Sequence, residues 1–284
     1  MKVSYYPGCS LDGTAREYGE SIEAVCKELN IELEELDNWN CCGSSSAHVS
    51  NDALALSLAA RNLEIAAKAD MDLIVPCAAC YQRLKVAEKE LRAGKKIDGI
   101  SQKYNENLQI KHIADFFWED LGDNTIALSV KKHLGSLSPV CYYGCLTTRP
   151  PKVTGASNPE DPQAMDNLLK SMSANVKKWS YKTDCCGGSL LYTRPDIAWK
   201  LVQKILDMAM EAGADCIAVS CPMCMASLDT TQKQISEETG KEYNMPVLYL
   251  TELMGVSFGI PAAEKWLRRH AIDPVPLLRR AALI

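Results

Sequence analysis

Two stretches of sequence decide the fold: Leu73-Ile74-Val75-Pro76-Cys77-Ala78-Ala79-Cys80 and, 144 residues later, Ile217-Ala218-Val219-Ser220-Cys221-Pro222-Met223-Cys224. Each is a short apolar run that ends in a Cys-x-x-Cys motif, as a buried strand followed by a turn would. The same offset relates Cys41-Cys42-Gly43 to Cys185-Cys186-Gly187. Because several markers recur at one spacing, the chain is an internal duplication.

The start of each copy carries a further marker. Tyr5-Tyr6-Pro7-Gly8-Cys9 is echoed by Tyr142-Tyr143-Gly144-Cys145 at an offset of 136, so the second copy holds eight extra residues. They fall in Arg149–Asp161, a loop rich in Pro, Gly, Ser and Asn. We therefore expect a first domain at 1–130, a second at 131–260 and an irregular C-terminal tail at 261–284.

Apolar runs alternate with helical patterns in both copies, which predicts an α/β fold. Each domain is expected to hold a small, mostly parallel sheet flanked by helices, and a pseudo-twofold axis should relate the two. The expected strands are 3–6, 31–36, 73–75, 140–143, 176–181 and 217–219, with helices at 14–29, 52–69, 81–92, 161–172, 197–212 and 226–238. Each copy closes with a strand-to-helix segment, at 110–120 and 247–254.

Composition excludes several classes of protein. The chain has 284 residues and a net charge of -5, with scattered Lys and Arg, so it lacks the basic footprint of a nucleic-acid-binding protein. Its longest apolar stretches, such as Ala53–Ala60, are too short to span a membrane. The N-terminus has no signal-peptide pattern, so we expect a cytoplasmic protein. Thirteen cysteines in such a chain indicate metal or redox chemistry rather than disulfides.

The cysteines are expected to meet at one face of each sheet, since the carboxyl ends of parallel strands converge there. Five thiols per copy leave one surplus for tetrahedral zinc. The Cys-x-x-Cys-His motif of haem c is absent, because Tyr81 and Met225 occupy the final position, and so is the ferredoxin run. Adjacent cysteines can serve different irons, so an unusual iron–sulfur cluster in each copy is favoured, with a zinc scaffold as the alternative.

The duplicated pattern resembles the CCG signature of the catalytic HdrB-like component of heterodisulfide reductase and its relatives, over residues 3–254. The resemblance implies two non-cubane [4Fe-4S] clusters, each bound by five cysteines. One set is Cys9, Cys41, Cys42, Cys77 and Cys80, and the other is Cys145, Cys185, Cys186, Cys221 and Cys224. Thirty-four residues separate Cys42 from Cys77, one fewer than is usual in the family.

The resemblance also implies a function. Each cluster would supply one electron to a bound disulfide, such as the coenzyme M–coenzyme B heterodisulfide of methanogenesis, and release two thiols. No G-x-G-x-x-G motif for flavin or NAD occurs, so electrons would come from partners: an HdrC-like iron–sulfur protein and an HdrA-like flavoprotein, which could bifurcate electrons. The alternatives are the CCG component of a thiol:fumarate reductase, a lactate or glycolate oxidase or a sulfur-oxidation complex, or a non-catalytic electron relay.

Several single residues carry further expectations. Leu146 stands where methanogen members usually have a His after the cysteine, so the proton donor is unknown. Arg149 and Arg194, each before a Pro, could bind an anionic group of the substrate, and His48 could donate a proton. His112, which matches Tyr249 only loosely, is expected to be structural. Three other cysteines are expected in the core: Cys26, Cys141 and Cys216.

Overall fold

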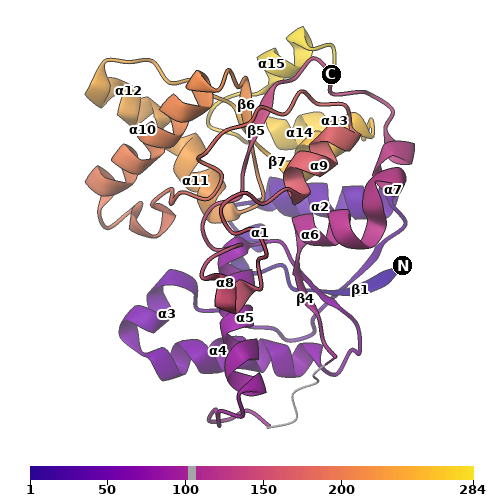
Figure 1. Cartoon of the computed structure of the whole chain (residues 1–284), viewed down its shortest axis with the longest axis vertical. Helices are drawn as coiled ribbons and strands as arrows, with labels where there is room; N and C mark the ends of the chain where they lie inside the picture. The colour runs from indigo at the N-terminus through magenta and orange to yellow at the C-terminus, as the bar shows by residue number, and fades with distance from the viewer. Residues whose placement is uncertain (102–106) are drawn as a thin grey trace.

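The first copy builds a parallel sheet of four strands in the order β2-β1-β3-β4, in a computed structural model that describes residues 1–101 and 107–284 (Figure 1). Its strands are β1 (Lys2–Tyr5), β2 (Glu32–Glu35), β3 (Leu73–Val75) and β4 (Ile110–His112). Its helices are α1 (Cys9–Asp12), α2 (Arg16–Glu28), α3 (Ser44–Ser50), α4 (Asp52–Ala66), α5 (Ala78–Arg92), α6 (Ile113–Phe116) and α7 (Gly122–Ser129), with a π-helical turn at Phe117–Leu121.

The second copy repeats this arrangement with a parallel sheet of three strands in the order β5-β6-β7. The strands are β5 (Pro139–Tyr142), β6 (Cys216–Val219) and β7 (Val247–Tyr249). The helices are α8 (Pro151–Thr154), α9 (Ala164–Ser171), α10 (Pro195–Glu211), α11 (Pro222–Thr230), α12 (Gln232–Thr239) and α13 (Leu250–Ser257), with a 3-10 turn at Gly188–Leu190. The predicted α/β fold with parallel sheets flanked by helices is therefore confirmed.

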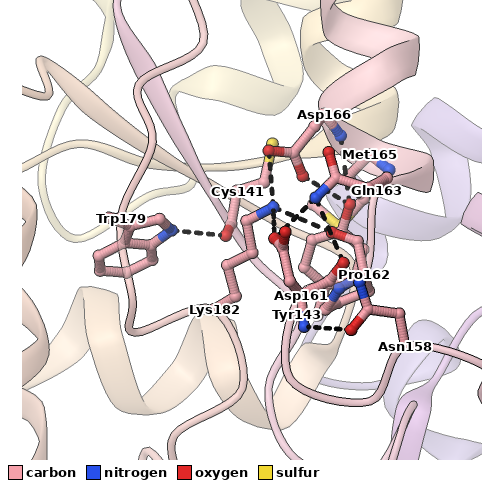
Figure 2. A network of polar contacts seen from close by, with 10 residues as sticks. All are labelled: Cys141, Tyr143, Asn158, Asp161, Pro162, Gln163, Met165, Asp166, Trp179 and Lys182. Atoms are coloured by element: carbon pink, nitrogen blue, oxygen red, sulfur yellow. Dashed lines mark hydrogen bonds and ion pairs between the residues drawn. The ribbon is translucent and has the colours of Figure 1, made fainter.

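One predicted strand is wrong. Residues 176–181 run beside β5 without forming a strand. The N–H of Lys177 donates to the carbonyl of Pro139, but the next contact comes from a side chain: the Trp179 indole donates to the carbonyl of Cys141 at 2.9 Å (Figure 2). Because the indole takes the carbonyl that a paired strand would use, the ladder stops.

Helices of the two copies pack against each other across the boundary between them. Helix α2 of the first copy packs against α13 of the second, and α9 of the second packs against α6 of the first. The contact between α2 and α13 includes a buried hydrogen bond of 2.7 Å between Ser21 and Thr251. One hydrophobic core consequently runs through both copies, from Tyr18 and Ile22 on α2 to Leu253 on α13. The division into domains at 1–130 and 131–260 stays a prediction.

The C-terminal residues pack onto this boundary rather than trailing away from it. They form α14 (Ala263–Leu267) and α15 (Val275–Arg280), two short helices in a segment for which the sequence predicted irregular structure. Helix α14 contacts α2 and α13, and Trp266 is buried to 1% exposure. Among the described residues, no helix is both long and apolar enough to cross a membrane.

Candidate metal centre

The cysteines lie where the strands of each copy end. Cys9 begins α1 just after β1, and Cys77 caps the N-terminus of α5 just after β3. In the second copy Cys145 follows β5, and Cys221 caps the N-terminus of α11 just after β6. Thiolates are favoured at such helix N-termini because the backbone N–H groups there are unpaired and the helix dipole is positive.

Loops bring the remaining thiols to the same places. Cys41 Sγ lies 3.7 Å from Cys9 Sγ, and Cys42 Sγ lies 3.4 Å from Cys80 Sγ. In the second copy, Cys186 Sγ lies 3.7 Å from Cys224 Sγ, and Cys145 and Cys185 shift each other's pKa. The structure thus gathers the predicted ligands of each copy. The contacts are pairwise: no three His, Cys, Asp or Glu side chains of the described residues already surround one metal position.

The two thiol sets adjoin each other. Cys77 of the first set and Cys221 of the second are both buried, and each thiol perturbs the pKa of the other. At the outer ends of the sets, Cys9, Cys41 and Cys185 are exposed. The two sets therefore meet at the boundary between the copies through buried thiols, and each set also has at least one thiol exposed to solvent.

The backbone around the thiols obeys the same pseudo-symmetry. Gly8 and Gly144 have φ of 75° and 69°, and a Cβ atom there would lie 2.9 Å from Cys80 Sγ and 2.8 Å from Cys224 Sγ, respectively. Tyr6 donates its hydroxyl to the carbonyl of Asn40, the residue before Cys41. Tyr142 does the same to Asp184, the residue before Cys185. Each Tyr hydroxyl therefore holds the backbone carbonyl of the residue immediately before a Cys-Cys pair.

Hydrogen bonds lower the pKa of some of these thiols. Contact with the Cys41 and Cys80 thiols lowers the pKa of Cys42, and contact with the Cys224 thiol lowers the pKa of Cys186. Cys26, Cys141 and Cys216 behave differently, because burial raises the pKa of each. These three thiols lie in the hydrophobic core, where we expected them.

A buried clamp between the copies was not expected from the sequence. His112 Nε2 lies 3.1 Å from the carbonyl oxygens of both Pro76 and Ser220, the residues immediately before Cys77 and Cys221. The Tyr18 hydroxyl lies 3.2 Å from the same two oxygens. Two side chains of the first copy thus tie together the backbones that present the innermost thiol of each set.

The predicted substrate residues are occupied by other contacts. The Arg149 guanidinium pairs with Glu160 and donates to Thr183 at 3.1 Å. Arg194 forms a two-pronged ion pair with Asp196, at 2.9 and 2.8 Å, on the exposed surface. His48 lies on α3, with its Nδ1 atom 2.9 Å from the Arg83 guanidinium. Binding of a substrate by these three residues stays a prediction.

A family model for the CCG cysteine-rich domain matches residues 3–85 and 140–229, which are the two copies. The chain is 32% identical, over 97% of its length and 99% of the relative's, to the 8-methylmenaquinol:fumarate reductase membrane anchor subunit of Wolinella succinogenes. It is 25% identical, over 98% of its length and 96% of the relative's, to the B subunit of the ferredoxin:CoB-CoM heterodisulfide reductase of Methanosarcina mazei.

A solved structure shows the same fold. The crystal structure of a hypothetical protein from Helicobacter pylori matches with a TM-score of 0.75 and 13% identity, over 96% of this chain. The chain spans about half (52%) of that protein. Two family matches, on the two copies whose cysteines the structure gathers, establish the relationship. The chain belongs to the family of CCG cysteine-rich domain proteins.

Proposed function

We propose that this chain is the iron–sulfur component of a multisubunit reductase complex and holds one non-cubane [4Fe-4S] cluster in each thiol set. The observation that carries the proposal is the meeting of two five-cysteine sets at Cys77 and Cys221. The first set is Cys9, Cys41, Cys42, Cys77 and Cys80, and the second is Cys145, Cys185, Cys186, Cys221 and Cys224. The relatives support it, because those named above are subunits of reductases.

The donor set fits iron and sulfide. Thiolate is the ligand that iron–sulfur clusters take from proteins, and every group gathered at the two sites is a thiol. Gly8 and Gly144 leave the space beside Cys80 and Cys224 that any side chain would fill. When bound, such clusters supply electrons one at a time, so two neighbouring clusters suit a two-electron reduction.

The chain's own residues shape the environment of the sites. Leu146 and Met223 pack against the cores of both copies, so apolar side chains lie where the copies meet. Tyr18 and His112 hold the backbones of Pro76 and Ser220 together and thereby fix the spacing between the sets. The exposed thiols Cys9, Cys41 and Cys185 mark the open sides that a substrate or partner would approach.

The reaction we propose is reduction of a disulfide. One disulfide takes up two electrons and two protons, the S–S bond breaks, and two thiols leave. Electrons would come from the partners expected from the sequence, an HdrC-like iron–sulfur protein and an HdrA-like flavoprotein, in a cytoplasmic complex. Burial lowers the pKa of His112, and its Nε2 atom is already hydrogen-bonded to two carbonyls, so His112 is not the proton donor. We propose that the protons come from groups around the bound substrate or from a partner protein.

A second candidate function is electron transfer to a fumarate-reducing partner. It is favoured by the 32% identity to the fumarate reductase subunit of Wolinella succinogenes, over nearly the whole of both chains. In that case the clusters held by the thiol sets would pass electrons to a separate flavin site, and this chain would bind no disulfide.

The test is an electron-acceptor assay on the complex purified anaerobically from its own host. Reduced viologen is supplied as the electron donor, and the acceptor is either coenzyme M–coenzyme B heterodisulfide, another low-molecular-weight disulfide, or fumarate. Oxidation of the dye by a disulfide, lost in Cys185→Ala, supports the proposed reaction. Oxidation by fumarate alone establishes the second candidate and overturns the first. Oxidation by neither, in a complex that retains its iron, contradicts both.

A further inference from the structure

A cavity of about 470 Å³ opens at the boundary between the copies and is not part of the thiol sites. Its walls come from α5, β4, α6 and the π-helical turn of the first copy and from residues 143–164 of the second. The residues that matter here are Tyr81, Lys85, His112, Asp115, Trp118 and Thr148. Because His112 lines the cavity and also holds the carbonyls before Cys77 and Cys221, this side chain links the cavity wall to the thiol sets.

The internal duplication shows what the same place contains in the other half. Sheet register pairs Val75 with His112 in the first copy and the equivalent Val219 with Tyr249 in the second, so Tyr249 is the counterpart of His112. Continuing along the following helix, Glu252 is the counterpart of Asp115, and Gly255 is the counterpart of Trp118.

In the second copy this place is filled by the chain's own C-terminal segment. His270 Nε2 lies 2.8 Å from the Glu252 carboxylate, and both side chains are buried. The Trp266 ring lies over Gly255, where a Cβ atom would come within 2.6 Å of it. The backbone N–H groups of Ala271 and Ile272 donate to Asp229 at 2.6 and 3.0 Å. A basic side chain and a length of backbone thus close the site.

In the first copy the equivalent carboxylate is left without a partner. No ion pair or side-chain hydrogen bond reaches Asp115 from the part of the chain that the structure describes. The two lysines beside the cavity wall are already paired: Lys111 pairs with Asp120, and Lys182 lies between Asp161 and Asp166 at 2.7 and 3.0 Å (Figure 2). Burial raises the pKa of Asp115 to about 6, although the charge of Lys111 opposes the shift.

Two further groups in the cavity can contact an occupant. The Thr148 hydroxyl is buried, with the residue only 4% exposed, and it has no hydrogen-bond partner within the described ranges. Lys85 stands at the position equivalent to Asp229, five residues after the last cysteine of its motif. Its ammonium group pairs with Glu88 and carries three donors, so it can also bind a backbone carbonyl. Trp118, the counterpart of Gly255, is itself an aromatic residue of the cavity wall.

We propose that this cavity is the docking site for a segment of a partner protein in the complex, which inserts a basic side chain against Asp115 as His270 is inserted against Glu252. The occupant is a polypeptide because a polypeptide fills the equivalent place, and it is basic because the unmatched charge is a carboxylate. It needs no aromatic anchor, since Trp118 already covers that part of the wall. The proposal rests on the proposed place of the chain in a reductase complex.

The test is photo-crosslinking in the native host. The photoreactive residue p-benzoylphenylalanine replaces Ser157 on the cavity rim, and a control replaces the exposed Glu237 on α12 at another part of the surface (Figure 1). The crosslinked complex is purified and the joined peptides are identified by mass spectrometry. Each probe is combined with Asp115→Asn, or with the matched control Asp120→Asn, which alters a carboxylate already paired with Lys111.

We expect crosslinks from position 157 to a single partner segment that contains Arg, Lys or His. Asp115→Asn should reduce their yield by more than about tenfold, and Asp120→Asn should leave it unchanged. Crosslinks that are insensitive to Asp115→Asn, or none in an intact complex, overturn the proposal, as does a small molecule that co-purifies in the cavity. Iron and sulfide are measured on the same samples: full content without crosslinks refutes docking but leaves the proposed function standing.

Discussion

Replacing Gly144 with Ala should eject metal from the second thiol set, and the structure offers a control for it. Gly144 has φ of 69° and a Cβ atom there would lie 2.8 Å from Cys224 Sγ, against 3.4 Å for the start of ordinary van der Waals contact. Gly213 has φ of 71°, and a Cβ atom there would have nothing within 4 Å. Both Ala variants suffer the same left-handed backbone strain, but only Gly144→Ala presses on a thiol.

The expected magnitudes follow from these two effects. The left-handed conformation costs an Ala about 1–2 kcal/mol, so Gly213→Ala should lose about that much free energy of unfolding. Gly144→Ala should lose about 1–3 kcal/mol more, because the overpacked side chain forces its neighbours to move. The required shift of Cys224 Sγ, at least about 0.6 Å, exceeds the roughly 0.2 Å that metal–ligand distances tolerate.

The assay measures iron content and the urea midpoint of both variants, purified anaerobically. Gly144→Ala should lose about half of the iron and unfold at the lower urea concentration, whereas Gly213→Ala should keep all of it. Full iron content in Gly144→Ala would refute the assignment of Cys224 as a ligand. Equal iron loss in Gly213→Ala would show that backbone strain alone, rather than contact with the thiol, releases the metal.

Three further predictions concern the clamp, the C-terminal segment and the cysteines. His112→Leu should lower the free energy of unfolding by about 1–3 kcal/mol in urea titrations, because buried carbonyls lose a donor; unchanged stability would contradict the clamp. Burial lowers the pKa of His270, but the charge of Glu252 outweighs it and raises the pKa to about 9. This stabilisation, about 3 kcal/mol, should be fully present below about pH 6.5 and disappear as the pH rises through 9, and a His270→Gln variant that keeps the same pH profile would disprove it. Cys41→Ala should remove about half of the iron, whereas Cys26→Ala, in the core, should remove none; the reverse pattern would exclude the assigned sets.

The sequence predicted the sheets and the gathering of the cysteines because both depend on short-range patterns. The runs at Leu73–Val75 and Cys216–Val219 are apolar and end in Cys-x-x-Cys motifs, and parallel strands bring their ends together by geometry alone. The repeat then placed the second set from the first. No separate information about the second copy was needed beyond the common offset.

The features that sequence reasoning missed depend on contacts between distant segments. Residues 176–181 repeat the predicted strand at 31–36 in the internal duplication, but the Trp179 side chain takes a carbonyl that pairing would need. Tyr18 and His112 meet at the boundary between the copies, although they are 94 positions apart in the chain. His112 is structural, as expected, yet its place between the two thiol sets appears only when both sheets are assembled.

The C-terminal segment is the other case. Residues 261–284 contain Arg268-Arg269 and closely spaced prolines, and their composition suggests irregular structure. The buried pair of His270 and Glu252 forms because α13 presents a carboxylate at the boundary, which no local pattern around His270 reveals. A comparison of the two copies would have found it only after the strand register had aligned Glu252 with Asp115.

The measurement that tests the central claim most directly is the iron, zinc and acid-labile sulfide content of the anaerobically purified protein. Two clusters in the two thiol sets predict about eight iron and about eight sulfide per chain, with little zinc. About two zinc per chain and no sulfide would contradict the account, because the cysteines would then be a zinc scaffold without redox chemistry.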